Sequence, residues 1–403
     1  MQQGHRQASF ERACADPGQF LVAAQDTCFF NYTSHPAMKG LGRIRGDILG
    51  IAMHSTMLFS ERGQPLGLLD QQYWSRDGAV DYNGIESDKW LDGLHATNKQ
   101  LQNCDKHIVL VQDREADVFR FIKAATSPPS EPESDKAPAK PEVSVLIRVH
   151  EPRNLQLVSN GGIVRMDRIA GLLPVGGEQH RITIDRGSKQ VTLTLSLQAA
   201  RVHVLPDKDK SIKKHKTAEL SLVIATEVAA VDQTGKNVFN SKEAAQWYLL
   251  TALPIDSQED IVRILRFYSL RWRIERFHYT MKSGGLKVEQ LQFDDLNTMI
   301  HALAFYAVVA WQLLALTYGV RQDEAADARR YYEADELRIL AASSKKPINT
   351  VGEATQALGK LVGFVPTKRQ PYPGVKILAE AIHQLYHMVR ALRMTSNIKT
   401  LQD

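Results

Sequence analysis

Apolar residues in the first 125 positions occur in short continuous runs rather than at helical intervals. These runs have the length of strands, and they lie at 20–25, 48–60, 65–75 and 108–111. The second and third runs are joined by Glu61–Gln64, a connection of hairpin length that contains a turn glycine. A helical pattern over Lys89–Leu101 precedes the last run, with Ser87 or Asp88 as its cap. The pattern predicts three consecutive antiparallel strands, then a helix and a short buried strand.

The middle of the chain alternates between apolar and polar residues in the manner of β-strands. Such runs lie at 143–149, 181–184, 191–197, 202–205, 220–228 and 247–253, with turn residues between them. They predict a mostly β insertion at 143–245, followed by a buried strand. Residues 126–142 are rich in Pro, Ser and Glu and predict a disordered loop, because they cannot bury apolar area. Residues 207–216 are basic and would either contact a DNA backbone or form an exposed charged hairpin.

Helical periodicity dominates the rest of the chain. The stretch 258–283 lacks Gly and Pro, with Asp256 or Ser257 as a possible cap and Gly284 and Gly285 as a stop. The apolar stretch 296–318 contains His301 and Gln312, which favours a buried core helix over a membrane span. Further helical patterns lie at 334–342, 351–362 and 375–392. They predict a helical region at 321–403.

Composition narrows the class of protein only a little. With 403 residues, 43% hydrophobic and 24% charged, the chain has the profile of an ordinary soluble globular protein. Its net charge of +5 permits a polyanionic partner without requiring one. Three widely spaced cysteines indicate neither a disulfide framework nor a zinc site, and the N-terminus has no apolar signal region. A cytoplasmic protein is expected.

One face of the helix predicted at 258–283 carries a distinctive set of polar groups. At 100° per residue, Arg271, Glu275 and Lys282 fall at roughly 300°, 340° and 320° from Tyr268. A carboxylate flanked by Arg, Lys and a phenol suits a site that handles a metal and a phosphate. The alternative is a solvated helix face with i, i+4 charge pairs.

Two aspartates accompany predicted strands. The run 20–25 leads directly to Asp26 on the first strand, and Asp113 lies just past the carboxyl end of the run 108–111, in the sequence DREAD. A position just past a strand's carboxyl end is where open α/β sheets place their ligands. Asp113 could instead serve only as the N-cap of the helix that follows through Val118 and Ile122.

The spacing of Tyr268, Arg271, Glu275 and Lys282 is the YREK signature, and the segment resembles bacterial cut-and-paste transposases of the insertion-sequence-four family. The DREAD sequence and the strand before Asp26 are also similar to that family. The resemblance implies that Asp26, Asp113 and Glu275 form a DDE triad, which would hold two Mg²⁺ or Mn²⁺ ions for cleavage and transfer of DNA strands.

The same resemblance implies an architecture and partners. The expected α/β fold is a ribonuclease H-like core at 1–125 and 246–320, interrupted by the loop 126–142 and the β insertion 143–245, with the C-terminal helical region at 321–403. Double-stranded DNA would be the substrate, bound by a homodimer.

Two more residues have family counterparts. Trp247 aligns with a tryptophan that stacks on a flipped base, with a core Trp as the alternative. Arg148 aligns with an arginine near the active site. A further family lysine is replaced here by Tyr279.

Asp26 lies too close to Met1 for the N-terminal domain with which family members recognise transposon ends. The expectation is therefore a truncated transposase, or one whose start codon has been placed too far downstream. A catalytically idle DNA-binding or inhibitory subunit that pairs with a full-length enzyme is the alternative. A metal nuclease or hydrolase on the same fold is a third possibility, and it would need neither Arg271 nor Lys282.

Overall fold

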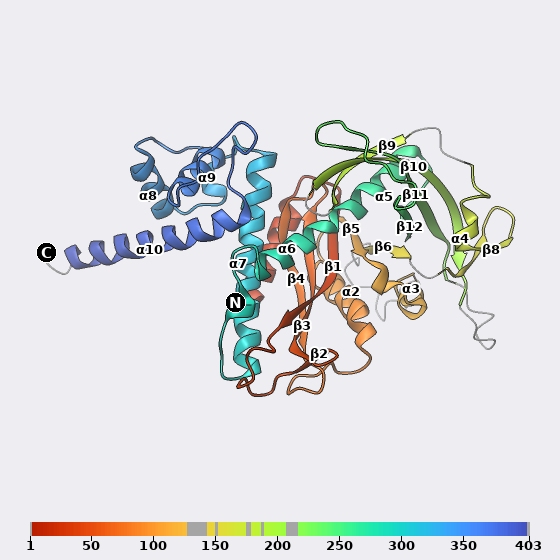
Figure 1. Ribbon diagram of the computed structural model, residues 1–403, viewed down its shortest axis with the longest axis horizontal. Coiled ribbons are helices and arrows are strands. Elements are labelled where there is room, and N and C mark those ends of the chain that lie inside the picture. The colour runs from red at the N-terminus through yellow and green to blue at the C-terminus, as the bar shows by residue number, and fades with distance from the viewer. Residues whose placement is uncertain are drawn as a thin grey trace.

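The computed structural model describes residues 2–126, 143–149, 152–174, 179–186, 189–206 and 217–400. The protein is mixed α/β, with helices packed around a large mixed sheet (Figure 1). The loop expected at 126–142 lies outside the described residues except for Thr126, which ends a helix, and the basic segment 207–216 lies outside them entirely.

Five strands form the half of the sheet that carries both candidate aspartates. They are β1 (Phe20–Asn31), β3 (Ile48–Ser60), β4 (Pro65–Trp74), β5 (His107–Gln112) and β6 (Val143–Val149). Strand β3 pairs antiparallel with β1 and β4, whereas β5 lies parallel to β1 and to β6. The short β2 (Gly42–Arg45) extends the edge at the start of β3. The three antiparallel strands and the buried strand predicted from the apolar runs are therefore confirmed.

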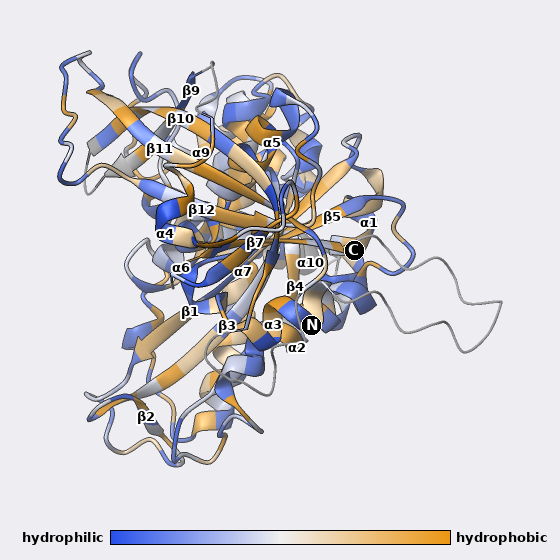
Figure 2. Ribbon diagram, turned by 90° about the vertical axis from the view of Figure 1, so that its right-hand side faces the viewer, coloured by the Kyte–Doolittle hydropathy of each residue, from blue (hydrophilic) through white to orange (hydrophobic). Residues whose placement is uncertain are grey.

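The second half of the sheet continues from β6 without a gap. It consists of β12 (Gln246–Thr251), β11 (Leu220–Asp232), β10 (Lys189–Val204), β7 (Asn154–Leu157) and β8 (Ile163–Arg165), with β9 (Gln179–Arg186) paired to β10. Figure 2 shows that these central strands are mostly hydrophobic. Strand β10 is one long strand where the pattern predicted two, because Gln198–Arg201 keeps its pairing with β11. Strand β6, which the expected boundaries assign to the insertion, pairs with β5.

Helices cover both faces of the first half-sheet. On one face lie α1 (Gln2–Ala15), α2 (Lys89–Gln100) and α3 (Phe119–Thr126), which bury Trp90 and Phe121 among others. Helix α2 approaches β1 so closely at Gly93 that no side chain fits there. A Cβ at this position would lie 1.9 Å from the side-chain Nε2 of Gln25. A one-turn helix, α4 (Met166–Ile169), lies beside β8.

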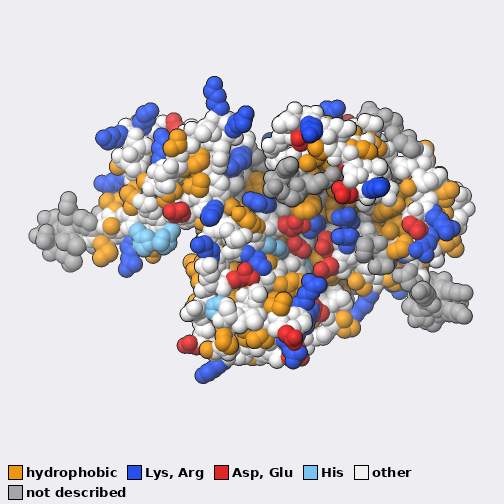
Figure 3. Space-filling model, in the orientation of Figure 1, with side chains coloured by type: hydrophobic (Ala, Val, Ile, Leu, Met, Phe, Trp, Pro, Cys, Tyr) orange, Lys and Arg blue, Asp and Glu red, His pale blue; other side chains and the backbone are white. Residues whose placement is uncertain are grey.

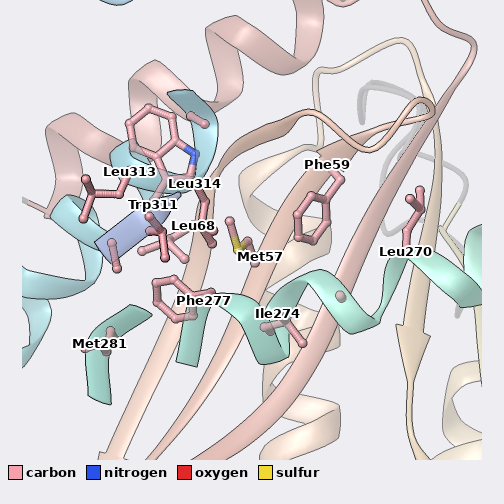
Figure 4. Packing of buried hydrophobic residues seen from close by; sticks show 14 of the residues in the cluster. Met57, Phe59, Leu68, Leu270, Ile274, Phe277, Met281, Trp311, Leu313 and Leu314 are labelled. Carbon is pink, nitrogen blue, oxygen red and sulfur yellow. The ribbon is translucent and has the colours of Figure 1, made fainter. Parts of the chain in front are cut away.

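The opposite face is covered by α5 (Gln258–Leu270), α6 (Trp272–Lys282) and α7 (Leu296–Gln322). The predicted apolar stripe is buried as expected: Leu270, Ile274, Phe277 and Met281 lie near Met57, Phe59 and Leu68 of the sheet and the C-terminal half of α7 (Figure 4). The predicted cap is also present, because Ser257 and Asp260 form a capping box.

The prediction of one uninterrupted helix over 258–283 is wrong. The helix breaks at Arg271, where the Arg271 amide bonds to the Tyr268 carbonyl and the Ile274 amide to the Arg271 carbonyl. Both are bonds between residues three apart, which tighten the turn into 3₁₀ geometry. No Gly or Pro marks this break, so composition could not reveal it.

Helix α7 is, within the described part of the chain, the one helix long and apolar enough to cross a membrane. Half of its most apolar window is buried inside the protein, including Leu303, Ala307 and Leu313. It packs against β4 and α6, as the predicted core helix should. The helices α8 (Ala334–Ser344), α9 (Val351–Lys360) and α10 (Val375–Thr400) follow, and the far end of α10 projects away from the body (Figure 1).

Candidate active site

Strand register brings the two candidate aspartates onto one face of the sheet. Ala24 of β1 is paired with Val111 of β5, which in turn is paired with Leu146 of β6. Side chains alternate along a strand, so residues two positions further on share that face. Those residues are Asp26, Asp113 and Arg148, and the face is the one that α5 and α6 cover. Figure 3 shows acidic side chains gathered over this region, with basic ones beside them.

Asp26 lies within β1, opposite Ser55 of β3. Its Oδ1 accepts a hydrogen bond from the Thr27 amide at 2.9 Å, and its Oδ2 lies 3.5 Å from Nδ1 of His278 on α6. Burial alone would raise the pKa of Asp26, but the hydrogen bond and charge of His278, together with the charge of Arg271, outweigh it and lower the pKa. Asp26 is therefore a carboxylate under ordinary conditions.

Asp113 follows β5 and caps the 3₁₀ turn Arg114–Ala116 by accepting a hydrogen bond from the Glu115 amide at 2.8 Å. The sequence left open that Asp113 caps the helix through Val118 and Ile122, but that helix, α3, begins only at Phe119, and Asp113 caps the separate 3₁₀ turn before it. Burial and then the negative charge of Asp26 raise the pKa of Asp113.

Glu275 comes from a third element, α6. Its Oε1 accepts a hydrogen bond from Arg271 Nη2 at 2.7 Å. Burial and the charge of Asp26 raise the pKa of Glu275, although Arg271 acts in the opposite direction. Like charges at one site oppose ionisation, so Asp26 is linked electrostatically to both Asp113 and Glu275.

Arg271 is the cation shared by all three carboxyl groups, and only 6% of its side chain is exposed. Burial would lower the pKa of Arg271, but the negative charges of Asp26, Glu275 and Asp113 raise it. A guanidinium at the break between α5 and α6 therefore offsets part of the repulsion among the acids.

The remaining signature residues differ in their surroundings. Tyr268 is 1% exposed and lies in the core with Trp247, the two ring centres being 5.6 Å apart. Trp247 is 5% exposed and packs in the hydrophobic core, whereas its stacking on a flipped base stays a prediction. Lys282 donates from Nζ to the Phe29 carbonyl of β1 at 2.9 Å and lies 3.2 Å from Glu289.

The expected polar face of the signature helix is thus not a solvent-exposed stripe. Arg271 and Tyr268 are buried, Glu275 is partly exposed, and Lys282 ties the end of α6 to β1. Arg148 is half-buried on β6, beside Leu249 of β12.

His278 was missed as a site residue by the sequence argument, which gave it no role. It lies one turn after Glu275 on α6, is 7% exposed, and has an Nε2 atom with no hydrogen-bond partner among the described residues. The available signal was its spacing, since residues three apart on a helix share a face.

The donor atoms suit a hard cation better than a soft one. Three carboxyl groups supply only oxygen, the donor that Mg²⁺ prefers, and their mutual repulsion is relieved by added positive charge. In the described part of the chain, however, no group of three or more His, Cys, Asp or Glu stands as a ready set of ligands. Glu275 is held by Arg271 and Asp26 by His278.

A scan of the chain against known protein families finds no match.

Proposed function

We propose that this protein is a metal-dependent DNA strand-transfer enzyme, a DDE transposase of the YREK type. The observation that carries the proposal is the convergence of Asp26, Asp113 and Glu275 from a strand, a strand end and a helix around one buried arginine. Phosphoryl transfer calls for positioning and charge stabilisation rather than for a covalent enzyme intermediate, and such a set offers both. Double-stranded DNA would be the substrate, and a homodimer would hold it.

The sheet supports a ribonuclease H-like core as the framework. Three consecutive strands, β1, β3 and β4, pair antiparallel, and β5 and β6 continue in parallel from β1. Asp26 lies on the first strand, Asp113 directly after β5, and Glu275 on a helix packed against the same face. These features support the proposed framework.

Divalent metal fits the site by the type of its donors. Asp26, Asp113 and Glu275 would hold Mg²⁺ or Mn²⁺, which when bound would activate a water or 3′-hydroxyl and stabilise the leaving oxygen. Glu275 would first have to leave Arg271, whose guanidinium would then be free to neutralise phosphate oxygens as a bidentate donor. His278 would keep Asp26 oriented during that exchange.

Lys282 would act at the other end of α6. Its ammonium group is partly exposed and bound to the Phe29 carbonyl and Glu289, which positions a point charge beside the strand that carries Asp26. In this proposal the lysine contacts the DNA backbone after separating from Glu289. Phosphate contacts of this kind position DNA and carry no sequence preference.

A second candidate is a DNA-binding subunit without catalytic activity. The observation that favours it is that two of the carboxyl groups already have partners within the protein. Arg271 is paired with Glu275, and His278 contacts Asp26. In that case the polar cluster would only stabilise the packing of α6 on β1.

A cleavage and joining assay separates the two. Purified protein is incubated with supercoiled plasmid and a labelled duplex with a free 3′-hydroxyl, in Mg²⁺, in Mn²⁺ or in EDTA. The enzyme reading predicts metal-dependent nicking and joining of the label to the plasmid, both lost in Asp113→Asn. Glu115→Gln, two residues away and 59% exposed, is the matched control and should retain activity. Equal activity in wild type and Asp113→Asn, or none in either while DNA is still bound, would contradict the enzyme reading.

A further inference from the structure

A pocket of about 470 Å³ lies where α1, the β3–β4 turn, α7 and α10 meet. None of the described residues that line it belongs to the acidic site. Its volume lies in the range of pockets that hold small molecules, which are mostly apolar with a few placed polar groups.

The walls of the pocket are largely aromatic and aliphatic, and the charged residues Arg12, Asp16, Arg330 and Glu336 also line it. Trp311, Tyr331 and Tyr332 contribute rings, and Leu316 and Leu385 contribute aliphatic surface. Most of these side chains are buried in the fold, so the walls are held in place by the core behind them. Flat aromatic walls favour a planar ring as the occupant.

Arg12 of α1 supplies a positive charge to this apolar space. Its guanidinium carbon lies 4.3 Å from the centre of the Trp311 ring, its Nε donates to the Leu66 carbonyl at 2.6 Å, and its Nη2 donates to Ser9 Oγ at 3.2 Å. Within the described chain it has no carboxylate within ion-pair distance, and Nη1 has no hydrogen bond. Burial lowers the pKa of Arg12 because its charge is partly desolvated. A desolvated guanidinium with a free donor favours a bound anion.

Two polar atoms of wall residues, Nε1 of Trp311 and Oε1 of Gln64, have no hydrogen-bond partner among the described residues. Both are shielded from solvent, so neither is accessible from the open space of the pocket and neither selects its occupant.

We propose that this pocket binds a small aromatic carboxylic acid, with its ring between Trp311 and Tyr331 and its carboxylate at Arg12. Aromatic rings and Arg are the side chains that anchor such ligands elsewhere, through stacking and charge-assisted hydrogen bonds.

The pocket is connected to the helix that carries Glu275. Gln64 Nε2 donates to the Ala315 carbonyl at 2.9 Å and to the Tyr331 hydroxyl at 3.0 Å. The neighbouring Gly63 carbonyl accepts a hydrogen bond from Arg273 of α6, and Glu61 pairs with Arg266 of α5 at 2.7 Å. Ligand binding should therefore slow amide exchange in the 61–64 turn and at the break between α5 and α6.

Calorimetric titration of the full chain with indole-3-acetate, indole and acetate tests the site without reference to DNA cleavage. Indole-3-acetate is expected to bind at least tenfold more tightly than indole, and acetate alone should not bind measurably. Arg12→Met should weaken indole-3-acetate binding at least tenfold. Arg6→Met, on the same helix but outside the pocket, is the matched control.

Arg12 also donates a hydrogen bond to the Leu66 carbonyl, so replacing Arg12 could disturb the fold as well as the pocket. A second variant therefore keeps Arg12. Ile382→Trp enlarges a half-buried residue of the pocket wall and should block indole-3-acetate while thermal unfolding shows an intact fold. The proposal is overturned if indole-3-acetate does not bind at 5 mM, if indole binds equally well, or if neither variant changes binding. Unchanged hydrogen exchange at 61–64 on saturation would overturn the link to α6.

Discussion

Arg271 and Glu275 form a hydrogen-bonded ion pair at 2.7 Å, in which the arginine side chain is 6% exposed and the glutamate 37%. The pair bridges one turn at the start of α6, directly after the helix break. Its asymmetry matters, because the buried partner is the cation and its charge also reaches Asp26 and Asp113. The arginine therefore stabilises the whole acidic cluster, and the glutamate can be released toward solvent.

Replacing this arginine should destabilise the fold in a pH-dependent way. Arg271→Met is expected to cost about 2 kcal/mol at pH 7.5, less than the roughly 3–5 of a fully buried pair because Glu275 is partly solvated. Without the cation, the pKa values of Asp113 and Glu275, already raised, rise further. In the variant, the folded state then binds protons more strongly than the unfolded chain, so lowering the pH stabilises the fold. The free energy lost in Arg271→Met should therefore be smaller at pH 5 than at pH 7.5. Urea unfolding at both pH values measures this, with Arg276→Met on the same helix as the control. An equal loss at both pH values would contradict the shared-cation account.

A buried ion pair anchors the end of the DREAD segment. Arg153 Nη2 lies 2.5 Å from Asp117 Oδ1, with side chains 2% and 1% exposed, and also donates to the Asp117 carbonyl at 2.8 Å. Removing one partner leaves a buried charge, so Arg153→Met or Asp117→Leu alone should cost about 3–5 kcal/mol. The double variant should recover most of that loss. Chemical denaturation of all four proteins gives the coupling energy, and additive losses would show that the pair is not a unit.

His54 should make stability fall in mild acid. It is fully buried on β3, with Nδ1 2.9 Å from the Thr27 hydroxyl, and burial together with Lys89 lowers the pKa of His54 to about 3. The unfolded chain binds the proton near pH 6.5, so it takes up more protons than the folded protein between these values. Stability is thus present above pH 6.5 and is lost as pH falls toward 3, by about 2 kcal/mol from pH 7 to pH 5.

His54→Gln should flatten the dependence of unfolding free energy on pH over that range, whatever its effect at pH 7. The exposed His301→Gln is the control and should leave the slope unchanged. A slope in His54→Gln equal to that of wild type would mean that this histidine is not held neutral.

The DNA contact proposed for Lys282 predicts a change in salt dependence. Lys282→Met should make the fall of log K, the DNA association constant, with log salt concentration shallower by about one for any duplex. The reason is that one phosphate contact is lost. Lys236→Met, in the exposed turn after β11, should leave the slope unchanged. Fluorescence anisotropy across a salt series measures both. No difference between the variants would mean that Lys282 only ties α6 to β1.

The strands and most helix limits were predictable because their signals are local. The run 48–60 and the capping residue Ser257 appear in the structure as the sequence indicates. The break at Arg271 was not predictable, since it arises from tertiary packing without Gly or Pro. A helical projection also placed Tyr268 and Arg271 on a polar face but could not tell that the sheet and Trp247 cover that face. His278 was missed because a lone histidine in a sequence shows no partner until β1 brings Asp26 beside it.

The central claim is that Asp26, Asp113 and Glu275 act together on one metal centre, and iron-directed cleavage of the protein tests it most directly. Fe²⁺ in place of Mg²⁺, with ascorbate and peroxide, generates hydroxyl radicals that cut the chain next to the bound ion. The account predicts three cuts, near residues 26, 113 and 275. Added Mg²⁺ should suppress all three by displacing Fe²⁺, and all three should disappear together in Asp113→Asn. Cuts at unrelated positions, no cuts, or cuts near 26 and 275 that persist in Asp113→Asn would contradict it.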